Sequence, residues 1–459
     1  MLKRENLHRY QLFVVDYILN HPNAAIFLDC GLGKTVISLT AIDELMYDSF
    51  EIGKVLVICP LRVGEVWVSE VKKWEHLRHL RISRSVGTEK ERLAALKADA
   101  DIYVINRENI PWLVEKSGLQ FDYDMLVVDE LSSFKNWKAK RFKALMKVRP
   151  LAKRVVGLTG TPTGSGGYMS LFAEMMVIDL GRRLGRFIGQ YKSCYFRPLA
   201  TNGQIVYSYG LLPGAEDIIN RKISDITISM SAVDNLDMPE KNVVEYPVRL
   251  DDRERKVYER MKNDLVIQTK EGEVTAANAA ALSGKLCQLS SGAVYRDDGT
   301  VAEIHDRKLD ALEDIIEAAV GRQVIVVYYF RHERDRIAAR LKEMKADFDF
   351  IDSDESIRRW NRGEYQVCLL HPMSAGHGLN LQESGCNLMV FVSTPFSVEA
   401  YQQTVGRIYR QGQKSRKVTI MHIMAEDTID SRIMKALERG STTQAALIEA
   451  VRAQIGGDA

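Results

Sequence analysis

Five residues near the amino terminus have the types and spacing needed to hold a nucleotide phosphate. The apolar run Ala25–Leu28 leads into Gly31-Leu32-Gly33-Lys34-Thr35. Two glycines let the backbone curve until its amides face a polyphosphate, while Lys34 brings a positive charge and Thr35 offers a hydroxyl to Mg2+. A helix expected from Val36 to Met46 would add the positive end of its dipole. Leu28 stands where the full pattern has glycine, so an ordinary strand-to-helix turn is the alternative.

Two carboxylates follow another apolar run. Asp129 and Glu130 come directly after Met125–Val128. Burying two acids at a strand end is unfavourable unless they hold a metal or bind a proton. The chemical interpretation assigns Asp129 to Mg2+, through water, and Glu130 to the water that attacks the γ-phosphate of a nucleotide. The alternative is a pair of helix-capping acids before Leu131.

Arg407 and Arg410 form a pair of cations late in the chain. Their spacing of three predicts that both guanidiniums lie on one face of a helix. Such a pair suits the charge that develops on a transferred phosphoryl group. The alternative is a solvated basic helix face.

A basic stretch and a glycine loop complete the set. Nine lysines and arginines and no acid lie between Lys135 and Arg154, with Trp137 and Phe142 among them. This composition suits contacts to nucleic-acid phosphates, although an exposed helix with lysines for solubility is the alternative. The loop at 373–380 lets the backbone approach a ligand, and its His377 has no second His or Cys at metal-ligand spacing.

The elements that must position these residues are two sets of short apolar runs. The first set is Ala24–Leu28, Val55–Cys59, Ile102–Ile105, Met125–Val128 and Arg154–Leu158. The second set is Val324–Tyr329, Phe348–Ile351, Gln366–Leu370, Leu388–Val392 and Lys417–Met421. Runs of this kind, with helical patterns between them, predict an α/β fold with parallel sheets covered by helices. Ligands bind beyond the carboxyl ends of such strands, where the first set ends in polar or small residues.

The two sets predict two domains with a linker at Asn235–Glu240. The expected first domain is 1–235, with a helical extension at 168–235. The expected second domain is 236–459, with a helical insertion at 251–290 and C-terminal helices over Thr428–Ala453. Short alternating pieces at Gln204–Tyr209 and Lys241–Val248 accompany them.

Length and composition agree with this division. A chain of 459 residues exceeds the size at which one core keeps growing. The six cysteines include no CxxC pair, which argues against a zinc site or a disulfide framework and favours a reducing compartment. No signal peptide and no apolar run of about 20 residues is visible, so we expect a cytoplasmic protein, or one in the nucleoid or host cytoplasm if a phage encodes it. The net charge of +2 indicates no particular partner.

The ordered motifs resemble helicase and translocase superfamily two, and within it the Swi/Snf-like branch of double-stranded DNA translocases. In chain order they are Leu7–Gln11 (the adenine-reading segment), Asp29–Thr35 (motif I), Cys59–Leu61 with the later Trp67 and Trp74 (motif Ia), Leu158–Pro162 (motif III), Val326–Phe330 (motif IV), Ser374–Leu381 (motif V), Ser393–Phe396 (the segment after it) and Gln403–Gln413 (motif VI). Phe134-Lys135-Asn136 is especially similar to the Swi/Snf-like version. The departure is in motif II, where Ser132 stands in place of the usual histidine. Ser132 can still hydrogen-bond toward motif III, and it is where coupling of hydrolysis to DNA would differ.

The resemblance implies two RecA-like lobes that share one ATP, with ATP and Mg2+ as cofactors. It implies ATP contacts from Arg9, Gln11, Gly31, Leu32, Gly33, Lys34, Thr35 and Gln403. Mg2+ would be held by Thr35 and Asp129, and catalysis would be carried by Lys34, Asp129, Glu130, Arg407 and Arg410. Coupling residues would be Ser132, Thr159, Thr161, Gly376 and Gly378, and nucleic-acid contacts would be Arg62, Lys135, Asn136, Arg331, Ser374 and Asn380.

The expected function is an ATP-dependent motor that moves on DNA, with the duplex favoured and RNA ranked below it. One alternative is a helicase that separates strands of DNA or RNA. The other is an ATP-gated DNA-binding scaffold with weak hydrolysis, motivated by Ser132. No membrane partner is expected, and the sequence identifies no protein partner.

Overall fold

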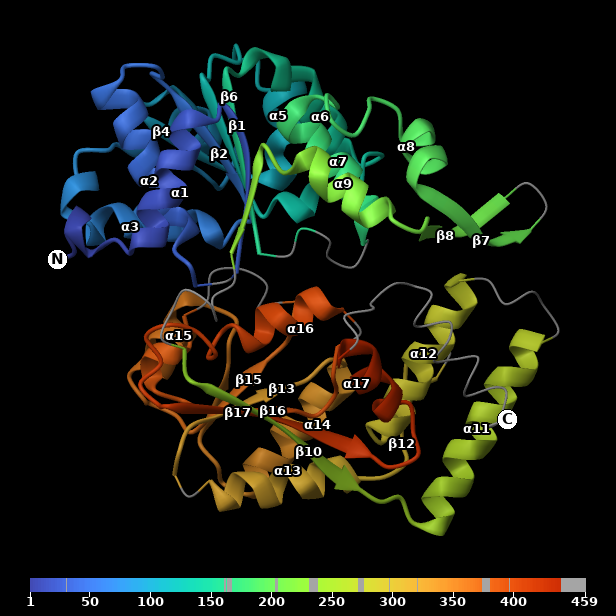
Figure 1. Cartoon of the computed structure of the whole chain (residues 1–459). Coiled ribbons are helices and arrows are strands. Elements are labelled where there is room, and N and C mark those ends of the chain that lie inside the picture. Colours follow the sequence, from blue (N-terminus) through green and yellow to red (C-terminus); the bar gives the residue numbers. More distant parts are fainter. Residues whose placement is uncertain are drawn as a thin grey trace. The chain divides into compact units, whose positions relative to one another are not determined.

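The chain divides into two compact units in the computed structural model (Figure 1). Unit 1 comprises Met1–Pro198 and Tyr209–Leu236, and unit 2 comprises Leu199–Ser208 and Asp237–Ala459. The structure describes residues 1–29, 31–160, 162, 167–202, 205–230, 238–270, 276–296, 298–319, 321–373, 380–395 and 397–438, with backbone alone at 200–202, 205–208, 264–270, 276–282 and 438. No helix in these ranges is long and apolar enough to cross a membrane.

Unit 1 is built on a seven-stranded sheet in the order β3-β4-β2-β5-β6-β1-β9. The strands are β1 (Asn23–Leu28), β2 (Val55–Cys59), β3 (Ile82–Ser85), β4 (Ile102–Asn106), β5 (Met125–Asp129), β6 (Arg154–Thr159) and β9 (Thr227–Met230). Every pairing is parallel, with Phe27 opposite Thr159 and Asp129 opposite Leu158. The ends of β1, β5 and β6 therefore meet at one edge of the sheet, which confirms the predicted parallel sheet and its five buried strands.

Helices cover both faces of this sheet. They are α1 (Arg9–Asn20), α2 (Lys34–Asp43), α3 (Val63–Lys73), α4 (Glu89–Lys97), α5 (Ile110–Glu115), α6 (Lys140–Val148), α7 (Tyr168–Asp179), α8 (Ile188–Tyr195) and α9 (Ala215–Ile223). In Figure 1, α1, α2 and α3 lie on one side of the sheet, and α5, α6 and α7 lie on the other. Strands β7 (Phe196–Asn202) and β8 (Ile205–Leu211) form a separate two-stranded sheet.

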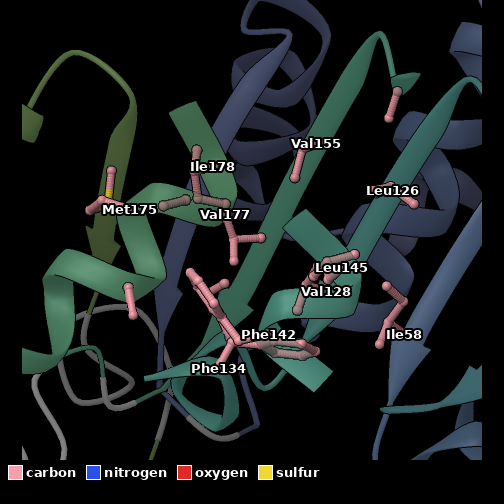
Figure 2. Close-up of a cluster of buried hydrophobic side chains, with 14 of the residues drawn as sticks. Ile58, Leu126, Val128, Phe134, Phe142, Leu145, Val155, Met175, Val177 and Ile178 are labelled. Carbon is pink, nitrogen blue, oxygen red and sulfur yellow. The ribbon is translucent and has the colours of Figure 1, made fainter. Parts of the chain in front are cut away.

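A dense apolar cluster fixes the turn that follows β5. Figure 2 shows Val128, Phe134 and Phe142 close together beneath the strands, with Ile178 of α7 above them. Leu131 and Phe134 bring the short 3-10 helix η5 (Leu131–Phe134) into this cluster, where both side chains are fully buried. The η5 backbone, which begins directly after Glu130, is thus anchored by about 1.5 to 3 kcal/mol of apolar burial for each of these side chains.

Unit 2 contains a six-stranded parallel sheet in the order β10-β17-β16-β13-β15-β14. Its strands are β10 (Glu240–Val248), β13 (Val324–Val327), β14 (Phe348–Phe350), β15 (Val367–Leu370), β16 (Leu388–Phe391) and β17 (Lys417–Ala425), and a hairpin is formed by β11 (Ala293–Tyr295) and β12 (Val301–Glu303). The helices are α11 (Asp252–Lys270), α12 (Ala276–Ser290), α13 (Arg307–Ala318), α14 (Arg331–Glu343), α15 (Asp354–Asn361), α16 (Val398–Val405) and α17 (Asp430–Glu438). The second predicted sheet is thereby confirmed. The helix expected over Thr428–Ala453 is described as far as Glu438, and its remainder lies outside the described residues.

Candidate functional site

The glycine loop joins β1 to α2 as predicted. Gly31 and Gly33 have φ values of 94° and 76°, in the left-handed region where a side chain is disfavoured. Lys34 is the first residue of α2, and its ammonium donates hydrogen bonds to the carbonyl oxygens of Leu28 (2.7 Å) and Asp29 (3.3 Å). The loop thus holds a cation over the end of β1, at the start of a helix that favours anions.

Helix α1 braces this loop through Tyr10 and Gln11. The Tyr10 hydroxyl and the Gln11 Nε2 both donate to the Leu32 carbonyl, at 3.1 and 3.3 Å, and the Gln11 Oε1 accepts the backbone N–H of His8. A Cβ at Gly33 would lie 2.4 Å from the Gln11 Nε2, so a side chain here would displace the Gln11 amide and would also strain the backbone at this φ. The buried Gln11 amide, expected at the adenine base, contacts the loop backbone here, and Arg9 lies exposed at the start of α1.

Asp129, at the end of β5, is only 6% exposed. Its Oδ2 accepts the indole N–H of Trp67 at 2.9 Å, and its Oδ1 accepts the backbone N–H of Glu130 at 3.1 Å. Burial raises the pKa of Asp129, while the Trp67 hydrogen bond and the positive charge of Lys34 act in the opposite direction. Lys34 and Asp129, which are distant in sequence, therefore lie within electrostatic reach of each other at one sheet edge.

Glu130 has a left-handed backbone conformation, with φ 60° and ψ 61°. This conformation costs a non-glycine residue about 1 kcal/mol, and such strain concentrates at functional sites. Arg107, directly after β4, interacts electrostatically with Glu130. Burial lowers the pKa of Arg107, and the negative charge of Glu130 opposes that effect. Trp67 was expected only as part of motif Ia, with no contact to Asp129, and Arg107 was assigned no role. The position of Arg107 after a strand was the available signal, whereas nothing in the sequence indicated the Trp67 bond.

The oxygen donors of Thr35 and Asp129 suit Mg2+, which prefers carboxylate and hydroxyl oxygens and takes its other ligands from phosphate and water. Among the described residues no group of three His, Cys, Asp or Glu side chains could hold a metal by itself. Two of the expected coupling residues are buried: Ser132 lies within η5, and Thr159 is the last residue of β6. Thr161 lies outside the described residues.

In unit 2 the predicted helical arrangement of Arg407 and Arg410 is wrong. Helix α16 ends at Val405, and the chain then turns, because Gly406 is a poor helix former. Arg407 is buried, and the Arg410 guanidinium donates to the Asn380 side-chain oxygen at 2.6 Å. A residue expected in catalysis thus contacts one expected at nucleic acid. Gln403 lies buried on α16.

The other residues expected at nucleic acid lie at strand ends. Arg62 is the exposed N-cap of α3, after β2, and Lys135 and Asn136 follow η5, after the neighbouring strand β5. Arg331 is exposed at the start of α14 in unit 2. The positions expected at Ser374, Gly376 and Gly378 lie outside the described part of the chain.

The basic stretch of 135–154 divides into structural and exposed cations. Arg149 is buried and donates to the Val177 carbonyl, and burial lowers its pKa to about 10. Arg154 donates to the Ile18 and Leu19 carbonyls of α1. Three more cations pair with acids: Arg141 with Glu108, Lys147 with Glu115 and Lys153 with Asp124.

The exposed cations include Lys138, whose ammonium lies 5.2 Å from the Trp137 ring, together with Lys140 and Lys143. The surface available to nucleic acid is therefore smaller than the stretch indicates.

Two family descriptions match the chain. The SNF2-related domain matches residues 10–291, and the helicase conserved C-terminal domain matches residues 307–412. Putative protein p41 of Acyrthosiphon pisum secondary endosymbiont phage 1 is 35% identical over 457 residues, covering 96% of this chain and 98% of that protein. The uncharacterized ATP-dependent helicase MG018 of Mycoplasma genitalium is 25% identical over 93% of this chain, which spans 41% of that helicase. The SWI2/SNF2 ATPase core of Sulfolobus solfataricus, solved in complex with dsDNA, is 20% identical with a TM-score of 0.45, over 98% of this chain and 95% of that one.

Proposed function

This chain belongs to the SNF2-related family of ATP-dependent helicases, and from that premise we propose that it couples ATP hydrolysis to movement along duplex DNA. The observation that carries the proposal is the convergence of Lys34 and Asp129 at one edge of the unit 1 sheet. A cation for phosphate and a carboxylate for a metal are the two groups that phosphoryl transfer needs to have close together.

The proposed nucleotide contacts begin in unit 1. The amides of Gly31, Leu32 and Gly33 and the ammonium of Lys34 bind the phosphates, so Lys34 must leave the Leu28 and Asp29 carbonyls when ATP arrives. Thr35 and Asp129 hold Mg2+, which neutralises phosphate charge. Arg9 and Gln11 reach the adenine.

Glu130 is the proposed general base. Its position directly after Asp129 places it beside the metal ligand, and its charge interacts with that of Arg107. A carboxylate in this position can accept a proton from the attacking water. Arg407 and Arg410 of unit 2 are proposed to stabilise the charge on the transferred phosphoryl group, and Gln403 to help bind ATP.

Contacts to nucleic acid are assigned to Arg62, Lys135 and Asn136 in unit 1 and to Arg331, Ser374 and Asn380 in unit 2. Exposed Lys138, Lys140 and Lys143 extend this set with non-specific phosphate contacts. Duplex DNA is the preferred partner because Phe134-Lys135-Asn136 resembles the version found in double-stranded DNA translocases.

The test is ATP hydrolysis measured with duplex DNA, single-stranded DNA and RNA. Duplex DNA is expected to stimulate most. Glu130→Gln keeps the size of the side chain but removes the proton acceptor, so kcat should fall by about 10² or more. The matched control is Glu115→Gln, which changes an acid paired with Lys147 at the surface and should leave hydrolysis near wild type. Absence of hydrolysis with every nucleic acid, or a Glu130→Gln variant as active as wild type, would refute the proposal.

Two strand assays separate movement from unwinding. Displacement of a third strand from a triplex, without release of a labelled strand from a tailed duplex, supports translocation on duplex DNA. Strand release would instead favour a strand-separating helicase. DNA binding that changes with ATP but without phosphate release would favour the ATP-gated scaffold, the alternative that Ser132 motivates.

A further inference from the structure

The carboxylate of Asp129 is held by an indole as well as by the backbone. Trp67 is fully buried, and its Nε1 donates to the Asp129 Oδ2 at 2.9 Å, across 62 positions of sequence. The other oxygen accepts the Glu130 N–H. A carboxylate in an apolar setting is oriented mainly by such donors, because little water competes for it. The Trp67 bond therefore helps to fix the orientation of the Asp129 carboxylate.

Trp67 belongs to the helix whose first turn carries a proposed nucleic-acid contact. Arg62 is the exposed N-cap of α3, and Trp67 lies five residues later, about 7.5 Å along the helix axis. A Cβ at Gly64 would lie 3.3 Å from the Arg84 Nε and 3.4 Å from the Val104 Cγ1, so this turn packs closely on β3 and β4. Because Arg62 and Trp67 belong to one continuous helix, a displacement of α3 at its first turn would also move the indole.

We propose that Trp67 is a positioning residue for Asp129, and that α3 uses it to transmit nucleic-acid engagement at Arg62 to the metal-binding carboxylate. This inference rests on the proposed function. Bound DNA would change how Mg2+ is held by acting through the Trp67–Asp129 hydrogen bond. Donors to a metal-binding carboxylate govern its orientation and its affinity for the metal.

The chain offers a matched control on the same helix. Trp74, the C-cap of α3, is also buried, and its Nε1 donates to the Glu70 Oε2 at 3.0 Å. Trp67→Phe and Trp74→Phe each remove one indole N–H from a carboxylate and each keep an aromatic ring. In Trp67→Phe the carboxylate that loses its donor is Asp129, whereas in Trp74→Phe it is Glu70.

The first readout is ADP binding by calorimetry, with and without Mg2+. For Trp67→Phe the gain in ADP affinity that Mg2+ provides should fall about tenfold, while affinity without Mg2+ stays at the wild-type value. The second readout is the ratio of kcat with duplex DNA to kcat without it, which should fall in the same variant while its Kd for DNA is unchanged. Trp74→Phe should match wild type in both. A purely structural role for Trp67 would lower ADP affinity equally with and without Mg2+.

If Trp67→Phe behaves as Trp74→Phe does, or loses affinity equally under both conditions, the inference is wrong. Should Trp67→Phe not fold, replacement of Trp67 by its benzothiophene isostere removes the N–H and keeps the shape, and the same two readouts decide. A wild-type protein that binds MgADP but shows no DNA-stimulated hydrolysis would refute the proposed function and the transmission step, while the ADP comparison would still decide whether Trp67 positions Asp129.

Discussion

Glu130 combines a proposed catalytic carboxylate with a strained backbone. Its φ of 60° is unfavourable for any side chain and suits glycine. We expect Glu130→Gly to be up to about 1 kcal/mol more stable than Glu130→Gln, although both lack the base. Urea unfolding of the two variants measures the difference. A Glu130→Gly protein that is less stable than Glu130→Gln would contradict this expectation.

Residue types were predictable at this scale, but their partners were not. Glycines, a lysine and a threonine in order predict a phosphate loop, and the parallel strand order brings Asp129 near Lys34. The Trp67 bond depends on how α3 packs, which no local pattern encodes. The helix predicted for Arg407 and Arg410 was wrong because a spacing of three permits a helix without requiring one.

At the scale of elements, the buried strands were predicted, whereas the edge strands of the unit 1 sheet were missed. Strands β2, β5 and β6 are fully buried and form continuous apolar runs. The edge strands β3 (Ile82–Ser85) and β9 (Thr227–Met230) alternate with polar residues and are too short to stand out. Strand β10 looked like an isolated alternating piece, but it pairs with β17 along its whole length. Its parallel partner lies far along the chain, so its sheet could not be assigned from sequence.

A buried ion pair joins four elements of unit 2. Lys308 of α13 is 1% exposed, and its ammonium lies 2.7 Å from the Asp430 Oδ2 of α17. The same ammonium donates to the Val392 carbonyl after β16, and the Asp430 Oδ1 accepts from the Ser290 hydroxyl of α12. The ends of these elements thus share one network of charged and polar groups.

Lys308→Met should destabilise the protein by about 3 to 5 kcal/mol, because it leaves the Asp430 carboxylate buried without its cation. Adding Asp430→Asn should recover part of that loss. Urea unfolding of both single variants and the double variant measures the coupling. Arg358→Met, which breaks an exposed pair with Glu355, is the control and should cost at most about 1 kcal/mol. A Lys308→Met variant no less stable than this control would contradict the role given to the buried pair.

At the scale of the whole molecule, the two units differ in how they bury histidine. His305, His332 and His422 all lie buried in unit 2, and burial lowers the pKa of each to about 4. Neighbouring charges also act on these pKa values: acids raise them and cations lower them. The charges near His422 are Lys308 and Asp430. Those near His332 are Glu333, Asp335 and Arg336, and those near His305 are Glu254, Lys308 and Arg336. In unit 1, burial lowers the pKa of the half-buried His76.

We therefore expect unit 2 to lose stability before unit 1 as pH falls. An unfolded histidine has a pKa near 6.5, so between about pH 6.5 and 4 the unfolded state binds protons that the folded state rejects. Three such groups give a slope of up to about 4 kcal/mol per pH unit, and their contribution levels off below about pH 4. Hydrogen exchange followed peptide by peptide, corrected for intrinsic rates, resolves the units. His422→Gln should lower the pH dependence of stability in unit 2 by the contribution of about one proton, and should leave that of unit 1 unchanged. Parallel loss of protection in both units across this pH range would show that the buried histidines do not govern acid unfolding.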